Sequence, residues 1–303
     1  MVTVRSRPLP VTLALGAHCV GSGAVHAALA RAHVALARGG YAVWGPERTR
    51  TGLLDGLLGD PGGPETAQAG RQLERAAGRI AMRRQALSER GARRLLLLDP
   101  ALLGNRRENV LMARLYPTAW ARLRRLRGAV PNIDRVCLTL REPGDWWAEA
   151  LASLTRRCLV APDATAAAAM ARSRRGWREV IEDVADALPR ARISVWTYEE
   201  FGARPEAAAA LLTGRTPPEG RGAAPEPAAP SPFDPDQRAT LAAAYDDDLA
   251  WLRSGASGLA HFVTERPDGS PPPDEEGTRH DRTGQRPRAV DGPGRDGASR
   301  PHA

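Results

Sequence analysis

The segment LALGAHCVGSGAVHAAL, residues 13–29, has the outline of an anion-binding loop. A short apolar run ends at Gly16, Gly21 follows, and helix-forming residues come after Ser22 and Gly23. Such a loop directs backbone N–H groups at an anion, and the helix dipole adds partial positive charge. However, Ser22 and Gly23 occupy the positions at which a phosphate-binding loop has Lys and Ser/Thr. The pattern disfavours an ordinary nucleoside triphosphatase and leaves open an anion site or a tight turn that binds nothing.

Five continuous apolar runs predict strands that are buried on both faces, because such strands do not alternate with polar residues. They are Val11–Leu15, Tyr41–Trp44, Leu95–Leu98, Val136–Leu140 and Ile193–Trp196. Between them, apolar residues recur at helical spacing, and this alternation predicts right-handed crossovers. The predicted fold class is three-layer α/β: a central, mostly parallel sheet of about five strands, flanked by helices, with a first βα turn like a phosphate-binding loop.

The distribution of Pro, Gly and apolar residues predicts five regions. A segment rich in Pro, Ala and Gly has too few apolar residues to pack, and the last part of the chain is equally poor in them. The regions are an N-terminal extension (1–10), the α/β core (11–212), a linker (213–232), a C-terminal helix packing on the core (233–253) and a disordered tail (254–303).

The composition narrows the class of protein without naming it. With 303 residues and 42% hydrophobic content, the chain can bury a sizeable core. The net charge of +8 favours an anionic partner, but every one of the 43 basic residues is arginine, as in GC-rich bacterial genomes. No apolar run reaches the ~18 residues of a membrane span. Three cysteines without a CxxC pair disfavour disulfides and structural zinc and favour the cytoplasm.

The N-terminus has a competing interpretation. Arg5 and Arg7 precede an apolar stretch, which is the outline of a secretory signal. Against it, apolar residues from Val25 to Leu36 continue at helical spacing through the site where cleavage would occur. We therefore expect one intact helix after the first loop.

The order of several motifs resembles that of the sulfotransferase family, especially its bacterial members. Residues 16–23, GAHCVGSG, are similar to that family's first loop, which commonly reads G-x-H-K-T-G-T-T. CLTLREPGDWWAEALAS, residues 137–153, is similar to its second signature, an arginine at a strand end with a serine eight residues later. WREVIEDVADALPRARISVWTYEEF, residues 177–201, has the strongest similarity, and the resemblance covers residues 11–252.

The resemblance implies transfer of a sulfuryl group from 3′-phosphoadenosine 5′-phosphosulfate, without a metal, to a hydroxyl or amine of a glycan or small molecule. The partners would be this nucleotide and an acceptor that the sequence does not name. Arg141 and residue 149 would hold the 3′-phosphate. The first loop would hold the 5′-phosphosulfate through Gly16, Ala17, His18, Cys19, Gly21, Ser22 and Gly23.

The chain departs from the family pattern at charged positions. Cys19 stands where the family has the lysine that stabilises the leaving phosphate, and Glu149 stands where it has the serine. Val20 and Gly23 also lack the hydroxyls found there. Losing one preorganised donor costs about 2.7–4 kcal/mol. A carboxylate ~4 Å from a phosphate charge is repelled by about 4 kcal/mol at an effective dielectric constant of ~20.

Two outcomes of these departures are open. Another arginine can enter the pocket and supply the missing charge, the candidates being Arg48, Arg50, Arg106 and Arg107. Alternatively, Glu149 pairs with Arg141 and closes the nucleotide site, leaving a non-catalytic protein that binds a ligand or partner.

His18 and Glu47 are the candidate catalytic residues. His18 could polarise an oxygen or act as a base, or it could merely hydrogen-bond the loop backbone. Glu47 follows the second predicted strand, and ligands of α/β sheets bind at the carboxyl ends of strands. It is a candidate base, with a solvated loop carboxylate as the alternative.

The arginine-rich segment RRQALSERGARR, residues 83–94, offers a nucleic-acid alternative. Glu74 and Glu89 are interspersed with the arginines, as on a solvated helix face, and no nucleic-acid module is recognisable. The sequence therefore disfavours a nucleic-acid partner.

Overall fold

Within the part of the chain that the structure describes, a single parallel sheet contains six strands. The strands are β1 (Val11–Gly16), β2 (Tyr41–Trp44), β3 (Arg94–Leu98), β4 (Ile133–Leu140), β5 (Arg192–Thr197) and β6 (His261–Phe262). Their order is β2-β3-β1-β4-β5-β6. This computed structural model describes residues 9–18, 22–58, 66–157, 159, 164–220 and 229–264. The first five strands were predicted, and the three-layer α/β class is confirmed.

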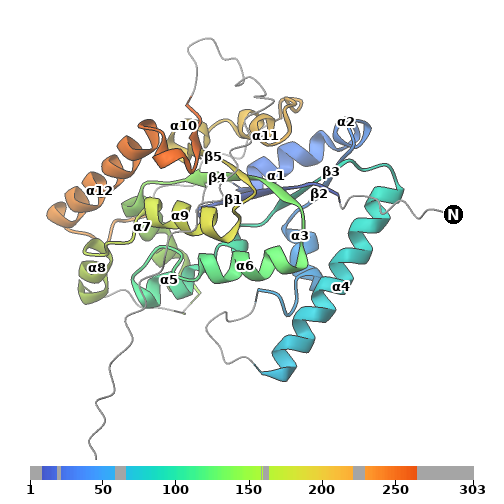
Figure 1. Cartoon of the computed structure of the whole chain (residues 1–303). Helices are drawn as coiled ribbons and strands as arrows, with labels where there is room; N and C mark the ends of the chain where they lie inside the picture. Colours follow the sequence, from blue (N-terminus) through green and yellow to red (C-terminus); the bar gives the residue numbers. More distant parts are fainter. Residues whose placement is uncertain are drawn as a thin grey trace, which may run out of the picture. The chain divides into compact units, whose positions relative to one another are not determined.

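Helices cover both faces of the sheet (Figure 1). One face is covered by α1 (Ser22–Arg31), α2 (His33–Arg38) and α11 (Pro205–Thr213). Their residues Leu29, Leu36 and Leu212 pack in one apolar layer with Leu96 and Trp196 of the sheet. The larger core on the opposite face includes residues from α4 (Ala67–Glu89), α6 (Ala119–Ala129), α7 (Pro143–Thr155), α9 (Trp177–Ala187) and α12 (Pro235–Arg253).

Local signals explain where the helices next to the candidate site begin. Pro143 occupies the first turn of α7, and the Glu142 side chain accepts the N–H groups of Gly144 and Asp145 at 2.9 and 2.7 Å. At α9, the Asp248 carboxylate of α12 accepts the Trp177 N–H at 2.7 Å. These caps satisfy N–H groups that a helix leaves without internal partners. They fix α7 directly after β4 and tie α12 to α9.

The other α-helices of the described residues are short: α3 (Pro46–Arg48), α5 (Arg106–Met112), α8 (Ala164–Ala171) and α10 (Tyr198–Phe201). Further helical turns cover Thr49–Leu53, Pro100–Leu102 and Ala256–Gly258. None of the described helices has both the length and the apolar composition required to span a membrane.

The C-terminal part differs from the predicted boundary at residue 254. His261 and Phe262 pair with Ser194 and Val195 of β5, so ordered structure continues through the sheet's edge strand. A strand of two residues has no periodicity that the sequence could reveal. The N-terminal residues 1–8, linker residues 221–228 and tail residues 265–303 lie outside the described residues.

Candidate functional site

The first βα turn and Arg141 share one edge of the sheet. Gly16 of β1 pairs with Thr139 of β4, and the Ala17 N–H donates to the Thr139 carbonyl at 2.9 Å. Arg141 follows β4 two residues beyond this pair. Because neighbouring parallel strands end at the same edge, the first turn and Arg141 lie at the same edge of the sheet.

A small cavity lies under the first turn. Gly16 and Ser22 line it together with apolar residues such as Leu98 and Trp196, and its volume is about 30 Å³. It holds about one water molecule, and Arg141 is not among the residues lining it. Among the described residues, no atom lies within 4 Å of a Cβ placed at Gly23, so packing against them does not require glycine at this position.

Three predicted loop residues, Cys19, Val20 and Gly21, lie outside the described residues. The structure thus describes the beginning of the first loop, through His18, and the start of α1 at Ser22. Among the described residues, Cys137 is a free, buried thiol whose pKa burial raises to about 11.

His18 is anchored to a buried tyrosine. Its backbone nitrogen and its Nδ1 both lie 2.8 Å from the hydroxyl oxygen of Tyr116, and the two rings stack with centroids 5.7 Å apart. Tyr116 packs against Trp146 and Trp177, and its carbonyl accepts a hydrogen bond from Arg175 at 2.8 Å. This contact fixes the plane of the imidazole and leaves Nε2 as the nitrogen that Tyr116 does not engage.

The environment of His18 keeps its imidazole neutral. Burial, followed by the positive charge of Arg106 and smaller effects of Arg50 and Arg122, lowers the His18 pKa to about 3, although Asp99 acts in the opposite direction. A group with this pKa is a weak base at neutral pH. Of the two functional roles predicted for His18, polarising an oxygen therefore fits better than proton abstraction.

A buried carboxylate beside His18 holds one of these arginines. Asp99 follows β3 and accepts hydrogen bonds from the Thr49 hydroxyl at 2.5 Å, from Arg50 Nη2 at 2.9 Å and from the Ala101 N–H at 2.9 Å. Burial alone would raise the Asp99 pKa, but the hydrogen bonds from Arg50 and Thr49 lower it. Arg50 is thereby held at the carboxyl end of the sheet.

Arg141 forms an ion pair with Glu149. Arg141 Nη2 lies 2.6 Å from Glu149 Oε1, and the two side chains are 9% and 17% exposed. The guanidinium carbon also sits 4.7 Å from the ring centroid of Tyr198, and the Arg141 carbonyl accepts the Trp177 indole N–H at 2.8 Å. The carboxylate thus occupies a hydrogen-bonding position on the guanidinium that the resemblance would assign to the 3′-phosphate.

Glu47 lies in α3, directly after β2, and faces α1. Its carboxylate is 3.3 Å from His26 Nε2 and is 65% exposed. It is therefore at the predicted end of the sheet, on the side where α1 begins. Its exposure also fits a solvated loop carboxylate, so the geometry leaves both interpretations standing.

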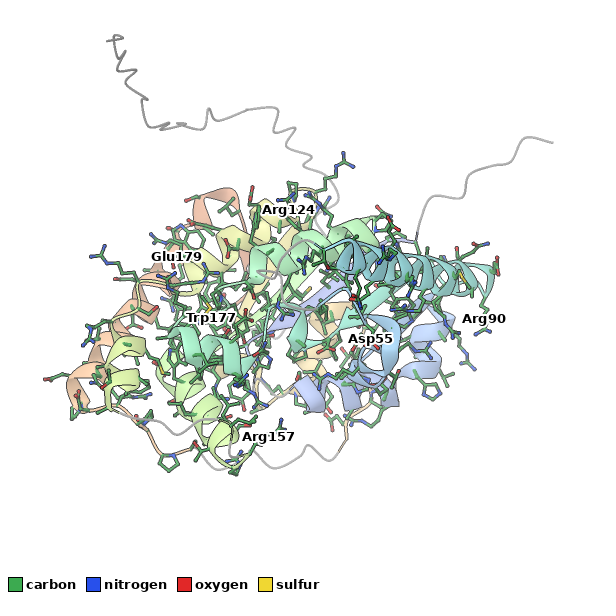
Figure 2. All side chains as sticks on the ribbon, turned by 90° about the horizontal axis from the view of Figure 1, so that it is seen from below. Asp55, Arg90, Arg124, Arg157, Trp177 and Glu179 are labelled. Carbon is green, nitrogen blue, oxygen red and sulfur yellow. The ribbon has the colours of Figure 1, made fainter. Side chains whose placement is uncertain are left out.

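A groove of about 580 Å³ lies beside the Arg141 region. Pro143 and Trp147 of α7, Gly176 before α9 and Trp251 of α12 line it, with Arg174 and Arg178 among its charged residues. Figure 2 shows Trp177 within the molecule and Glu179 on the same helix. The groove has the volume of a small-molecule site. Among the described residues, no group of three or more His, Cys, Asp or Glu side chains is arranged to hold a metal ion.

Sequence reasoning named part of this site. Two of the four arginines proposed to supply charge, Arg50 and Arg106, act electrostatically on His18. Arg48, Arg50 and Arg107 are all exposed. Asp99 was missed, although it follows a strand in the same way as Glu47. Tyr116 had no local signal, because it lies 98 residues from His18.

The arginine-rich segment at 83–94 is partly structural. Arg84 is buried and donates hydrogen bonds to the carbonyls of Leu9 and Pro131. Arg83, Arg90 and Arg93 are exposed, and Arg90 extends outward at the end of α4 (Figure 2). The segment therefore includes an arginine that holds the N-terminal end of the sheet.

The chain has a likeness among solved structures. No protein-family model and no curated protein matches the chain. Among solved structures, the chain is similar to a crystal structure of a sulfotransferase from Alicyclobacillus acidocaldarius, with a TM-score of 0.47 and 16% sequence identity. The match covers 82% of this chain and 96% of that chain. This likeness establishes neither a family nor an activity for the chain.

Proposed function

We propose that this chain binds a nucleotide sulfate donor at the carboxyl edge of its sheet and transfers the sulfuryl group to a hydroxyl or amine. The observation that carries the proposal is geometric: Tyr116 holds His18 at 2.8 Å and Asp99 holds Arg50 at 2.9 Å, both at the carboxyl edge of the sheet. The order of the motifs along residues 11–252 supports the choice of reaction. A cytoplasmic setting and a glycan or small-molecule acceptor belong to the same proposal.

The cluster offers a replacement for the missing lysine. Sulfuryl transfer breaks the bond between sulfur and the donor's bridging oxygen and forms a bond from sulfur to the acceptor's oxygen or nitrogen. As the first bond breaks, negative charge grows on the leaving 5′-phosphate. Arg50, held by Asp99, and Arg106 place positive charge at this edge of the sheet. The planar fork of arginine suits phosphate and sulfate, but Arg50 already directs Nε and Nη2 at Asp99, at 3.4 and 2.9 Å, so in this proposal it acts on the leaving phosphate by charge and not through that fork.

His18 and Glu47 take different roles in this proposal. With the Tyr116 hydroxyl donating to Nδ1, the neutral ring carries its hydrogen on Nε2, and this N–H donates a hydrogen bond to an oxygen of the transferred group without giving up the proton. The acceptor's proton then goes to Glu47, whose exposed carboxylate pairs with His26. Both roles are consistent with a site at the carboxyl ends of the strands, and neither requires a positively charged His18.

The donor that the resemblance implies, 3′-phosphoadenosine 5′-phosphosulfate, fits the described residues at one end only. The arginines beside His18 suit its 5′ end. Its 3′-phosphate does not fit Arg141, because Glu149 already occupies that guanidinium at 2.6 Å. We therefore assign no step to the 3′-phosphate.

A transfer assay tests the proposal. The full chain is incubated with ³⁵S-labelled adenosine 5′-phosphosulfate, with and without a 3′-phosphate, and a panel of hydroxyl and amine acceptors. We expect label in at least one acceptor, and we expect Arg106→Gln to reduce it while Arg90→Gln leaves it unchanged. If no acceptor is labelled although the donor binds, the second candidate function is correct.

That second candidate is a binding protein that has kept the fold without turnover. The Arg141–Glu149 ion pair favours it, because a neutralised guanidinium holds a nucleotide phosphate poorly. In that case the edge of the sheet binds an anionic ligand, and the assay detects binding without transfer.

A further inference from the structure

The Arg141–Glu149 ion pair is built into rigid elements at both ends. Arg141 follows β4 directly, and its carbonyl is held by the Trp177 indole. Glu149 lies inside α7, which begins two residues after Arg141 and is capped by Glu142. A carboxylate on this helix therefore stays beside the guanidinium without any loop having to close.

The surroundings of the pair leave little room for a second anion. The Arg141 guanidinium lies over the ring of Tyr198 and donates a hydrogen bond from Nη2 to Glu149 Oε1. Both side chains are mostly buried, so solvent screens their charges weakly. A phosphate placed on this guanidinium would meet the Glu149 carboxylate at close range and be repelled by it.

A carboxylate in this position suits a different group. Ionised Glu accepts hydrogen bonds and has further lone pairs beyond the one used by Arg141. Dinucleotide-binding sheets use the same contrast: a carboxylate recognises a ribose hydroxyl, whereas an arginine accommodates a phosphate on that ribose. Glu149 would accept a hydrogen bond from a ribose hydroxyl at the sheet edge.

We infer that the donor site selects a nucleotide with a free 3′-hydroxyl, of the nucleoside 5′-phosphate or 5′-phosphosulfate class, and rejects a 3′-phosphorylated one. This inference rests on the proposed function, since it requires a nucleotide at this edge of the sheet. It differs from the expectation that the motif order alone provides. The selecting residue is Glu149, acting directly on the ribose and through the charge it removes from Arg141.

The test compares two stable nucleotides by isothermal titration of the full chain. The probes are adenosine 5′-phosphate and adenosine 3′,5′-bisphosphate at one ionic strength. We expect the 5′-phosphate to bind at least tenfold more tightly. Glu149→Ser should reverse this preference, and Glu149→Gln, which keeps the shape without the charge, should reduce it. Glu89→Gln, an exposed carboxylate at the end of α4, is the matched control and should leave both affinities unchanged.

The outcomes separate this inference from the proposed function. If the bisphosphate binds as tightly as the 5′-phosphate, or more tightly, the inference is wrong while a nucleotide site remains. If neither nucleotide binds at millimolar concentration, the proposed donor site is wrong and the inference falls with it. If Glu149→Ser does not fold, as judged by its thermal unfolding, Glu149→Gln decides: an unchanged preference contradicts the inference.

Discussion

Arg141 Nη2 lies 2.6 Å from Glu149 Oε1, and this ion pair ties the end of β4 to the second turn of α7. The positive charge that the sequence places at the end of β4 is thereby already partnered. Two other arginines act electrostatically on His18: Arg50, which is paired with Asp99 at 2.9 Å, and Arg106, the first residue of α5.

Removing one partner of the ion pair should destabilise the fold. Arg141→Met leaves the Glu149 carboxylate mostly buried without its cation, and we expect the free energy of unfolding to fall by roughly 3 kcal/mol. The double variant with Glu149→Leu should recover most of this loss. Urea unfolding measures both. A double variant that is as unstable as the sum of the single variants would show that the two residues do not act as a pair.

Tyr116→Phe should weaken the anchor of His18. The change removes the hydroxyl that lies 2.8 Å from both the backbone nitrogen and Nδ1 of His18. Leaving a partly buried N–H without an acceptor costs about 1–3 kcal/mol, which chemical denaturation can measure. Tyr198→Phe is the control, because Tyr198 contacts Arg141 through its ring. Equal effects of the two changes would contradict the anchoring role.

His18 should make stability fall at acidic pH. Its pKa is about 3 in the folded chain and ~6.5 in the unfolded chain, so the unfolded state binds the proton first as the pH is lowered. Between pH 7 and pH 5 this difference removes roughly 2 kcal/mol of stability. His18→Asn should lack this component in urea unfolding at the two pH values. An unchanged pH dependence would show that His18 is not kept neutral by its surroundings.

Asp248 should act with the opposite sign. Burial, opposed by the hydrogen bonds from the Trp177 and Arg178 N–H groups, raises its pKa to about 6. The folded chain therefore binds this proton more tightly, and its contribution, present at low pH, is lost as the pH rises through 6. On going from pH 7 to pH 5, protonation of Asp248 should add roughly 1 kcal/mol to the free energy of unfolding, and Asp248→Asn should lack this gain. A larger gain in the variant would contradict the assignment.

These two titrations partly offset each other in the unmodified chain: together they remove roughly 1 kcal/mol of stability between pH 7 and pH 5. The single variants separate the two contributions.

The strands of the core could be predicted because each is a continuous apolar run between helical segments. β6 could not, because two residues carry no period and are ordered by pairing with Ser194 and Val195. The Arg141–Glu149 pair was predicted as one of two alternatives, since both residues lie within one strand–helix unit. Choosing between those alternatives required the distance between the side chains.

The rest of the site depends on contacts between distant segments. Tyr116 reaches His18 only because the segment between α5 and α6 lies against the first turn. No local sequence pattern in either segment predicts that contact. Asp99 is a different case. It could have been found by the strand-end rule that identified Glu47, because it comes directly after β3.

The most direct measurement of the central claim is the affinity of the full chain for adenosine 5′-phosphate, with and without the charges beside His18. We predict saturable binding by isothermal titration, weakened up to about fivefold by Arg50→Gln and by Arg106→Gln, since an exposed charge contributes up to about 1 kcal/mol. Gln at position 50 can still donate a hydrogen bond to Asp99, and Arg90→Gln should change nothing. Absence of binding, or equal binding by all four proteins, would contradict an anion site at this edge of the sheet.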